Sequence, residues 1–233
     1  MMATRRRSRF ALVALAALLA IGLAALGVWQ VERRAWKLAL IARVEARLAA
    51  APEAPPGRGA AISDDDAYRR LRASGTWRAV PPVFVQAVTD LGGGFWALSP
   101  LDTPSGTILV NRGFVPPERR AALPVPRGTA TVTGLLRITE PDGGFLRDND
   151  PAADRWYSRD VAAIARARRL GPVASYFIDA DAAPGTPWPR GGLTVVKFRN
   201  SHLVYALTWF TLAAMMAFLA WRIARVRDVA DER

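Results

Sequence analysis

The 233-residue chain contains no cysteine, a single histidine and only four methionines. The lack of cysteine excludes disulfide bonds, thiol redox chemistry and the cysteine pairs with which a copper chaperone would bind its metal. Two methionines begin the chain, and the other two, Met215 and Met216, lie together in an apolar stretch, so they form no Met-rich copper site. The histidine, His202, borders that stretch, and the segment before it lacks the imidazole base that nucleophilic catalysis most often uses. The sequence therefore gives no reason to expect an enzyme.

Charge is absent from two stretches of 22 residues, Phe10–Val31 and Asn200–Trp221. A helix of that length spans ~33 Å, which is enough to cross the hydrocarbon core of a bilayer. We therefore expect transmembrane helices at residues 10–31 and 200–221, a domain at residues 32–199 between them, and tails at 1–9 and 222–233. The alternative for the first stretch is a cleaved signal peptide, since basic residues precede it. Its apolar run is longer than the apolar region of a typical signal peptide, which favours a retained helix.

Basic residues beside the two stretches predict their orientation. Arginine precedes the first stretch and follows the second, at positions 5, 6, 7, 9, 222, 225 and 227. Basic flanks stay on the cytoplasmic side, whereas a long loop is translocated largely regardless of its charge. Both termini are therefore expected in the cytoplasm and the domain in the periplasm, with the protein in the inner membrane of a bacterium.

The formal net charge of +12 narrows the range of partners. A basic surface facing a membrane is suited to anionic lipid headgroups or to acidic proteins. The basic residues are dispersed along the chain and the expected compartment holds no nucleic acid. We therefore expect membrane lipids, and not nucleic acid, among the partners.

The central segment has the composition of a β-rich domain. Runs of β-branched and aromatic residues between Gly- and Pro-containing turns predict strands at 83–89, 95–99, 107–110, 130–139, 173–179 and 193–198. Helices are expected over 32–51, from Ser63 to about Leu71, and over 158–170 before Gly171-Pro172. Without βαβ alternation, the expected fold class is an α+β membrane protein. Its two transmembrane helices flank one periplasmic domain, an antiparallel sheet or small barrel with short helices attached.

An acidic loop before the last helix of the domain admits two interpretations. Asp148, Asn149, Asp150 and Asp154 together resemble a calcium-binding loop. The loop lacks the glycine and the distal glutamate of an EF-hand, however. Asx turns leading into Pro151 account for the same residues more simply.

His202 is the residue with the most specific chemistry. It follows Asn200 and Ser201, either of which would cap the second helix. One interpretation is an interfacial histidine bonded to headgroups or water, and the other is a ligand of a metal or haem iron. On a helix, Tyr205 and Trp209 share its face, three and seven residues further on.

Basic residues surround His202 in the sequence. Lys197 and Arg199 lie just outside the second apolar stretch, and Arg33 and Arg34 lie just outside the first. If the two helices are adjacent, these cations converge where haem propionates would need them. The alternative is that they only snorkel at the helix ends, as interfacial basic residues do in any membrane protein.

Several segments together resemble one family of membrane proteins, the surfeit locus protein 1 family. These segments are Leu26–Gln30 with Arg33 and Lys37; Pro100-Leu101 with Gly106 and Leu109–Pro116; Gly134–Glu140; Asn149-Asp150-Pro151; Trp156-Tyr157 with Arg159-Asp160; and Asn200–Phe210. Each is modest alone, but they occur in the family's order over nearly the whole chain. Phe114 departs from the tryptophan often found there.

The resemblance implies a non-catalytic assembly factor for cytochrome c oxidase. It implies two transmembrane helices, a β-rich outer domain, and delivery or insertion of haem a into the catalytic subunit of the oxidase. His202 matches the histidine associated with haem a binding in bacterial members. The implied partners are the catalytic subunit and, as a further candidate, haem a synthase. The alternative is a cofactor-free scaffold that stabilises an oxidase intermediate through the region of Asn111, Arg112 and Gly113.

Overall fold

The computed structural model describes residues 2–57, 59–144, 147–183, 185, 188–194, 198 and 200–225, and for residues 2–6 the backbone only. The chain forms two compact units. The helical unit comprises the described parts of Met1–Arg43 and Lys197–Arg233, and the barrel unit comprises those of Val44–Val196. Each unit is described separately.

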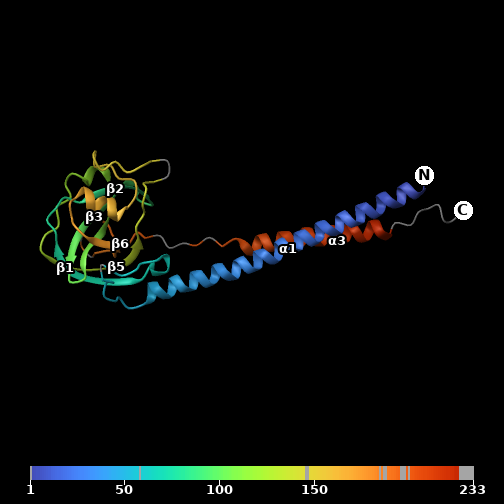
Figure 1. Cartoon of the computed structure of the whole chain (residues 1–233), viewed down its shortest axis with the longest axis horizontal. Helices are drawn as coiled ribbons and strands as arrows, with labels where there is room; N and C mark the ends of the chain where they lie inside the picture. The colour runs from blue at the N-terminus through green and yellow to red at the C-terminus, as the bar shows by residue number, and fades with distance from the viewer. Residues whose placement is uncertain are drawn as a thin grey trace. The chain divides into compact units, whose positions relative to one another are not determined.

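The helical unit consists of α1 (Met2–Ala49) and α3 (His202–Arg225), shown in Figure 1. Both helices are long and apolar enough to cross a membrane. The part of α1 beyond residue 31 continues without a break, as expected from the absence of Gly and Pro there. α3 begins at His202 rather than at Asn200. Ser201 is the residue before it, and its carbonyl accepts the first helical hydrogen bond from the backbone N–H of Tyr205.

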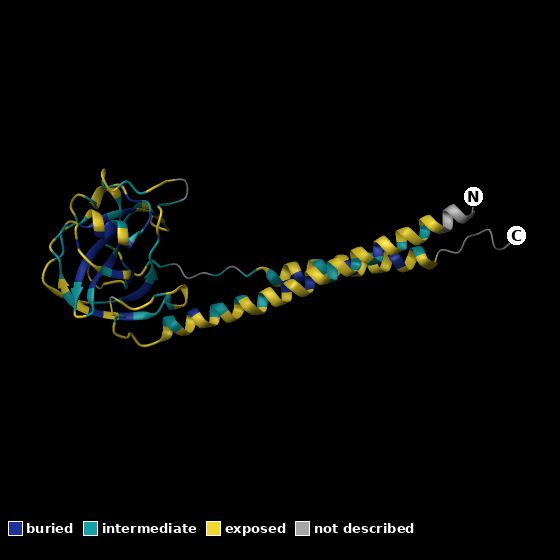
Figure 2. Ribbon diagram, in the orientation of Figure 1, coloured by how far each residue is buried: buried dark blue, intermediate teal, exposed yellow. Residues whose placement is uncertain are grey.

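The two helices pack through a regular line of residues that we call the seam. On α3 the buried and half-buried residues alternate at spacings of four and three: His202, Ala206, Trp209, Ala213, Met216, Ala220 and Ile223. On α1 the same spacing runs through Arg9, Val13, Ala16, Ala20, Leu23, Gly27 and Gln30. This repeat is that of a left-handed helix pair, and its small residues allow the backbones to approach closely. Figure 2 shows the remaining surface of both helices as mostly exposed.

The barrel unit is built from six strands in the order β1-β5-β6-β4-β3-β2. Their bounds are β1 (Arg70–Trp77), β2 (Val83–Thr89), β3 (Gly92–Thr103), β4 (Gly106–Val115), β5 (Thr129–Ile138) and β6 (Val173–Ala180). A further pairing of β1 with β3, at Thr76↔Asp102 and Trp77↔Leu101, closes five strands into a small barrel. β2 pairs with β3 outside the closed ring and extends the sheet. The expected small barrel is confirmed.

The central strands are buried on both faces, which explains their unbroken apolar runs. Ile108 and Val110 of β4 point into the barrel, where residues from all five closing strands form one core cluster. Leu109 points outward into a second cluster with residues of β2 and of the short helix α2 (Val161–Ala167). Trp156, only 1% exposed, belongs to this outer cluster. The loop before α2 therefore contributes a side chain to the core.

Four expectations about the domain were wrong. The sheet is mixed, because β4 and β6 pair in parallel while the other pairs are antiparallel. The helix expected from Ser63 is a single 3₁₀ turn, η1 (Asp64–Asp66), after which the chain enters β1. α2 is shorter than expected, because Asp160 caps it by accepting a hydrogen bond from the N–H of Ala163. In the segment expected to form a last strand, the described residues 193, 194 and 198 have no strand conformation.

Closure of the barrel makes Gly75 intolerant of a side chain. A β-carbon built on Gly75 would overlap the carbonyl oxygen of Asp102 on β3, whereas nothing lies within 4 Å of one built on Gly93. We expect Gly75→Ala to lower the free energy of unfolding of the barrel by about 1–3 kcal/mol, and Gly93→Ala to change it by less than about 0.5 kcal/mol. Denaturant unfolding of the detergent-solubilised chain measures both. Equal stability of the two variants would contradict closure at Gly75.

Candidate functional site

The candidate site of the helical unit is a hydrogen bond between α3 and α1. Nδ1 of His202 lies 2.7 Å from Oε1 of Gln30, a residue 172 positions earlier in the chain. Both residues lie on the seam, and Gln30 is only 9% exposed. The site is therefore a polar pair at the end of an otherwise apolar helix contact.

The direction of this bond decides the chemistry of the imidazole. The side-chain oxygen of Gln30 can only accept, so in this geometry a neutral ring carries its hydrogen on Nδ1. Nε2 then carries the lone pair, and it has no hydrogen-bond partner among the described residues. A histidine held at one nitrogen by an acceptor, with the other nitrogen unprotonated, has the arrangement found in metal-ligating histidines. The donor chemistry of the pair therefore fits axial ligation of a haem iron.

The other residues proposed from the sequence divide into three groups. Trp209 is half-buried on the seam two turns after His202, whereas Tyr205 is 55% exposed and lies off the seam. Arg33 of α1 stacks on its neighbour Trp36, with the guanidinium carbon 4.0 Å from the ring centroid. Lys197 and Arg199 lie outside the described residues. The structure thus aligns His202 with Trp209 and turns Tyr205 away from the helix contact.

Sequence reasoning named Arg34 as a candidate cation but missed Gln30 as a member of the site. Arg34 and Lys37 continue the four-three spacing beyond Gln30 and are half-buried. Nζ of Lys37 lies 5.3 Å from the ring centroid of Phe198, which precedes α3. A signal for Gln30 was present, since it is the one amide in the apolar stretch of residues 10–31.

A close contact between the helices lies next to this pair. A β-carbon built on Gly27 would come within 2.6 Å of Cε1 of Phe210, so a larger residue there would displace the phenylalanine ring. Gly27 and Gln30 are neighbours on one turn of α1, and their partners are eight residues apart on α3. The order of these contacts shows that the two helices run antiparallel.

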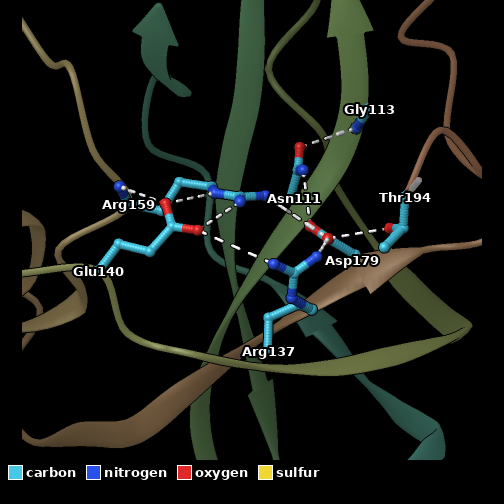
Figure 3. Close-up of polar contacts among 7 residues, drawn as sticks. All are labelled: Asn111, Gly113, Arg137, Glu140, Arg159, Asp179 and Thr194. Atoms are coloured by element: carbon cyan, nitrogen blue, oxygen red, sulfur yellow. Dashed lines mark hydrogen bonds and ion pairs between the residues drawn. The ribbon is translucent and has the colours of Figure 1, made fainter. Parts of the chain in front are cut away.

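The barrel unit has its own polar centre around Asp179 on β6, shown in Figure 3. The carboxylate of Asp179 is 6% exposed and accepts hydrogen bonds from Asn111 at 2.8 Å, Arg137 at 3.1 Å, Arg159 at 3.2 Å and Thr194 at 3.0 Å. These donors come from two strands, the loop before α2 and the segment that follows the barrel. The centre therefore ties four parts of the unit to one buried charge.

Glu140 completes the charge balance of this centre. Its carboxylate accepts from Nε of Arg159 at 2.9 Å and lies 3.9 Å from a guanidinium nitrogen of Arg137. Burial alone would raise the pKa of Glu140, but the hydrogen bonds and positive charge of Arg159 outweigh that effect and hold the pKa below its usual value. Two arginines and two carboxylates thus form a compensated network.

Asn111 also explains why Gly113 follows it. Oδ1 of Asn111 accepts a hydrogen bond from the backbone N–H of Gly113 at 3.1 Å. Gly113 has φ +129°, and a β-carbon there would overlap the backbone of Arg190. The Asn-Arg-Gly segment is therefore a bulge within β4, where the register against β3 shifts, and it connects to the Asp179 centre.

The acidic loop contains an Asx turn. Asp150 accepts from the backbone N–H of Ala153 at 3.1 Å and pairs with Arg155. Asp154 binds the indole of Trp156 and the guanidinium of Arg168. Within the described ranges, no three His, Asp or Glu side chains are grouped so that they would hold a metal ion. Asp154 therefore anchors Trp156, whose side chain lies in the core.

A family model described as "SURF1 family" matches residues 17–214 of the chain. The chain belongs to the SURF1 family. The match begins within α1 and ends within α3, so it includes the whole barrel together with Gln30 and His202.

Individual members of the SURF1 family are similar over most of their length. Surfeit locus protein 1 of Rattus norvegicus is 35% identical over 220 residues, which cover 84% of this chain and 70% of the rat protein. That of Homo sapiens is 36% identical over 218 residues, 83% of this chain and 71% of the human protein. A SURF1-like protein of Monosiga brevicollis is 36% identical over 210 residues, covering 82% and 78%.

The depressed pKa of Glu140 predicts how the barrel responds to acid. A carboxyl whose pKa is lower in the folded state stabilises the fold above its usual value near 4.5, and this contribution is lost as the pH falls further. We expect unfolding free energy to decline below about pH 4.5, and Glu140→Gln to remove part of that decline while lowering stability at neutral pH. Denaturant unfolding at a series of pH values measures this.

A matched control is Glu118→Gln, since Glu118 is exposed and forms no ion pair within the described part of the chain. Identical pH profiles for wild type and Glu140→Gln would contradict the role of the network.

Proposed function

We propose that this SURF1-family chain is a membrane-bound assembly factor of cytochrome c oxidase. It binds haem a at His202 and aids delivery of the haem to, or its insertion into, the catalytic subunit. Two helices of membrane-spanning length, and a segment of residues 32–199 whose sequence has no histidine or cysteine, support a role in binding rather than catalysis. Haem a synthase, as the source of the haem, is a further proposed partner.

The observation that carries the haem assignment is the pairing of His202 with Gln30. The bond at Nδ1 leaves Nε2 as the ligating atom. His202 is also the first residue of α3, so it stands where the apolar helix meets the polar connection to the barrel. His202 would hold the iron of haem a through this neutral imidazole nitrogen, and the haem would supply redox-active iron.

The residues around His202 have separate tasks in this proposal. His202 binds the iron, and Trp209, on the same seam, offers an aromatic surface to the macrocycle. Arg33, Lys197 and Arg199 provide positive charge for the propionates at the membrane surface. Tyr205, which is exposed on the same helix, would be a further contact for the haem. An apolar helix face beside a cationic border suits a ligand with a lipid-soluble tail and two carboxylates.

Placement in the membrane is also a proposal. The basic residues flanking both helices support cytoplasmic termini, with the barrel in the periplasm of a bacterium. In this orientation His202 lies at the outer surface of the inner membrane.

One feature of the barrel favours the second candidate, a cofactor-free scaffold. Arg112 is half-buried, and burial lowers its pKa without any carboxylate partner among the described residues. Its guanidinium lies 5.9 Å from the ring centroid of Trp77 and 3.4 Å from the carbonyl oxygen of Pro124. A partner protein with an acidic group would compensate this cation.

An optical spectrum of the detergent-purified chain, co-expressed with haem a biosynthesis, tests the haem assignment. We expect a haem a spectrum in wild type and none in His202→Ala, because the ligating nitrogen is removed. Val204→Ala, on the exposed face of the same turn, is the matched control and is expected to retain haem.

Equal haem in wild type and His202→Ala would place the ligand elsewhere. Colourless protein in both, with oxidase assembly normal in His202→Ala and lost in Arg112→Ala, would establish the scaffold instead.

The absence of native cysteine makes the orientation directly measurable. We expect Asp90→Cys, in the β2–β3 turn, to react with a membrane-impermeant maleimide in intact cells whose outer membrane is opened. Ala3→Cys is expected to react only after the inner membrane is permeabilised. The reverse pattern would overturn the proposed topology.

A further inference from the structure

Gln30 is an unusual residue for its surroundings. Apart from the indole of Trp29, it is the only side chain with hydrogen-bonding groups in residues 10–31. It lies on the seam and is almost fully buried. An amide in such a place loses its hydration and destabilises the helix pair unless another group satisfies it.

Its partner is the one imidazole in the molecule. The 2.7 Å separation of Oε1 and Nδ1 is that of a short, well-formed hydrogen bond. The bond joins the two helices at the residue that starts α3, three positions from the Gly27–Phe210 contact along α1. The ring of His202 is therefore held from the opposite helix and not by its own.

We infer that Gln30 is the positioning residue of the ligand site. Its carbonyl accepts the Nδ1 hydrogen, and this bond selects the tautomer with the lone pair on Nε2, orients the ring and raises the basicity of Nε2. The haem-related part of this inference rests on the proposed function, whereas selection of the tautomer does not.

The same bond couples the ligand site to the pairing of the helices. A helix pair that separates at this point loses the acceptor of His202, and the free ring then samples both tautomers and other orientations. Binding at Nε2 in turn favours the state in which Gln30 and His202 are in contact, because the two events share one imidazole. Ligand affinity and helix pairing therefore change together.

The alternative is that the side-chain amide of Gln30 is turned over, so that its oxygen and nitrogen exchange places. If the amide nitrogen of Gln30 faced Nδ1, it would donate, and the ring hydrogen would move to Nε2. Such a ring cannot bind a metal at Nε2 without losing that hydrogen. The tautomer of His202 therefore discriminates between the two cases.

The single histidine allows this to be measured without haem. Nitrogen NMR of the full chain, purified in detergent through a tag without histidine and labelled with ¹⁵N-histidine, reports one ring only. At about pH 8.5, we expect hydrogen on Nδ1 in wild type and a shift toward hydrogen on Nε2 in Gln30→Leu. Gln86→Leu, at the only other glutamine, which is exposed on β2, is the matched control.

Hydrogen on Nε2 in wild type, or an unchanged tautomer in Gln30→Leu, would overturn the inference. These outcomes do not depend on haem binding, so they are distinct from a failure of the proposed function.

A second measurement uses haem as the probe. Titration of haem a into the purified chain is expected to show about 10–100-fold weaker binding for Gln30→Leu. Gln30→Glu keeps an acceptor of nearly the same size and is expected to retain binding and to lower the midpoint potential, because a carboxylate makes the imidazole a stronger donor. Gln30→Glu also serves as a control, because a general folding defect from substituting Gln30 would lower haem binding in both variants. Equal loss of haem in both variants, or full binding in Gln30→Leu, would contradict the role of the bond.

Discussion

Polar groups that leave water need partners, and this requirement shapes both units of the protein. In the barrel, Asp179 is compensated by two arginines, an asparagine and a threonine from distant parts of the chain. In the helical unit, Gln30 and His202 satisfy one another on a seam otherwise made largely of apolar residues. With no cysteine to crosslink it, the chain relies on such pairs for the specificity of its contacts.

Local sequence patterns predicted the helices and strands better than they predicted which strands pair with each other. The β-branched run at 83–89 coincides with β2. The first charge-free stretch falls within α1, and all but the first two residues of the second fall within α3. β1 escaped prediction because Arg, Ser, Gly and Thr dominate it and its start resembles a helix. The closing contact of β1 with β3 and the parallel pairing of β4 with β6 are non-local, and no periodicity in the sequence encodes them.

In the candidate site, too, the sequence predicted a residue but not its distant contact. His202 was identifiable from the sequence because it is the only histidine and because its neighbours resemble those of the SURF1 family. Gln30 became part of the site only when the antiparallel helices brought residues 172 positions apart into contact. The proposed haem assignment follows from this geometry and the proposed membrane placement from the basic residues that flank the helices, whereas membership of the family depends on neither.

Because the alanines of the seam lie between the helices, a substitution at one of them would affect the His202–Gln30 contact from a distance. Ala213 is buried against α1 and lies 11 residues from His202, a separation of ~16 Å along the helix. A bulky side chain there would act as a wedge between the helices. The wedge would spread the pair at its other end, where Gln30 must reach the imidazole. Damage in mid-helix would then resemble loss of the histidine itself, although the substituted residue never touches the ligand.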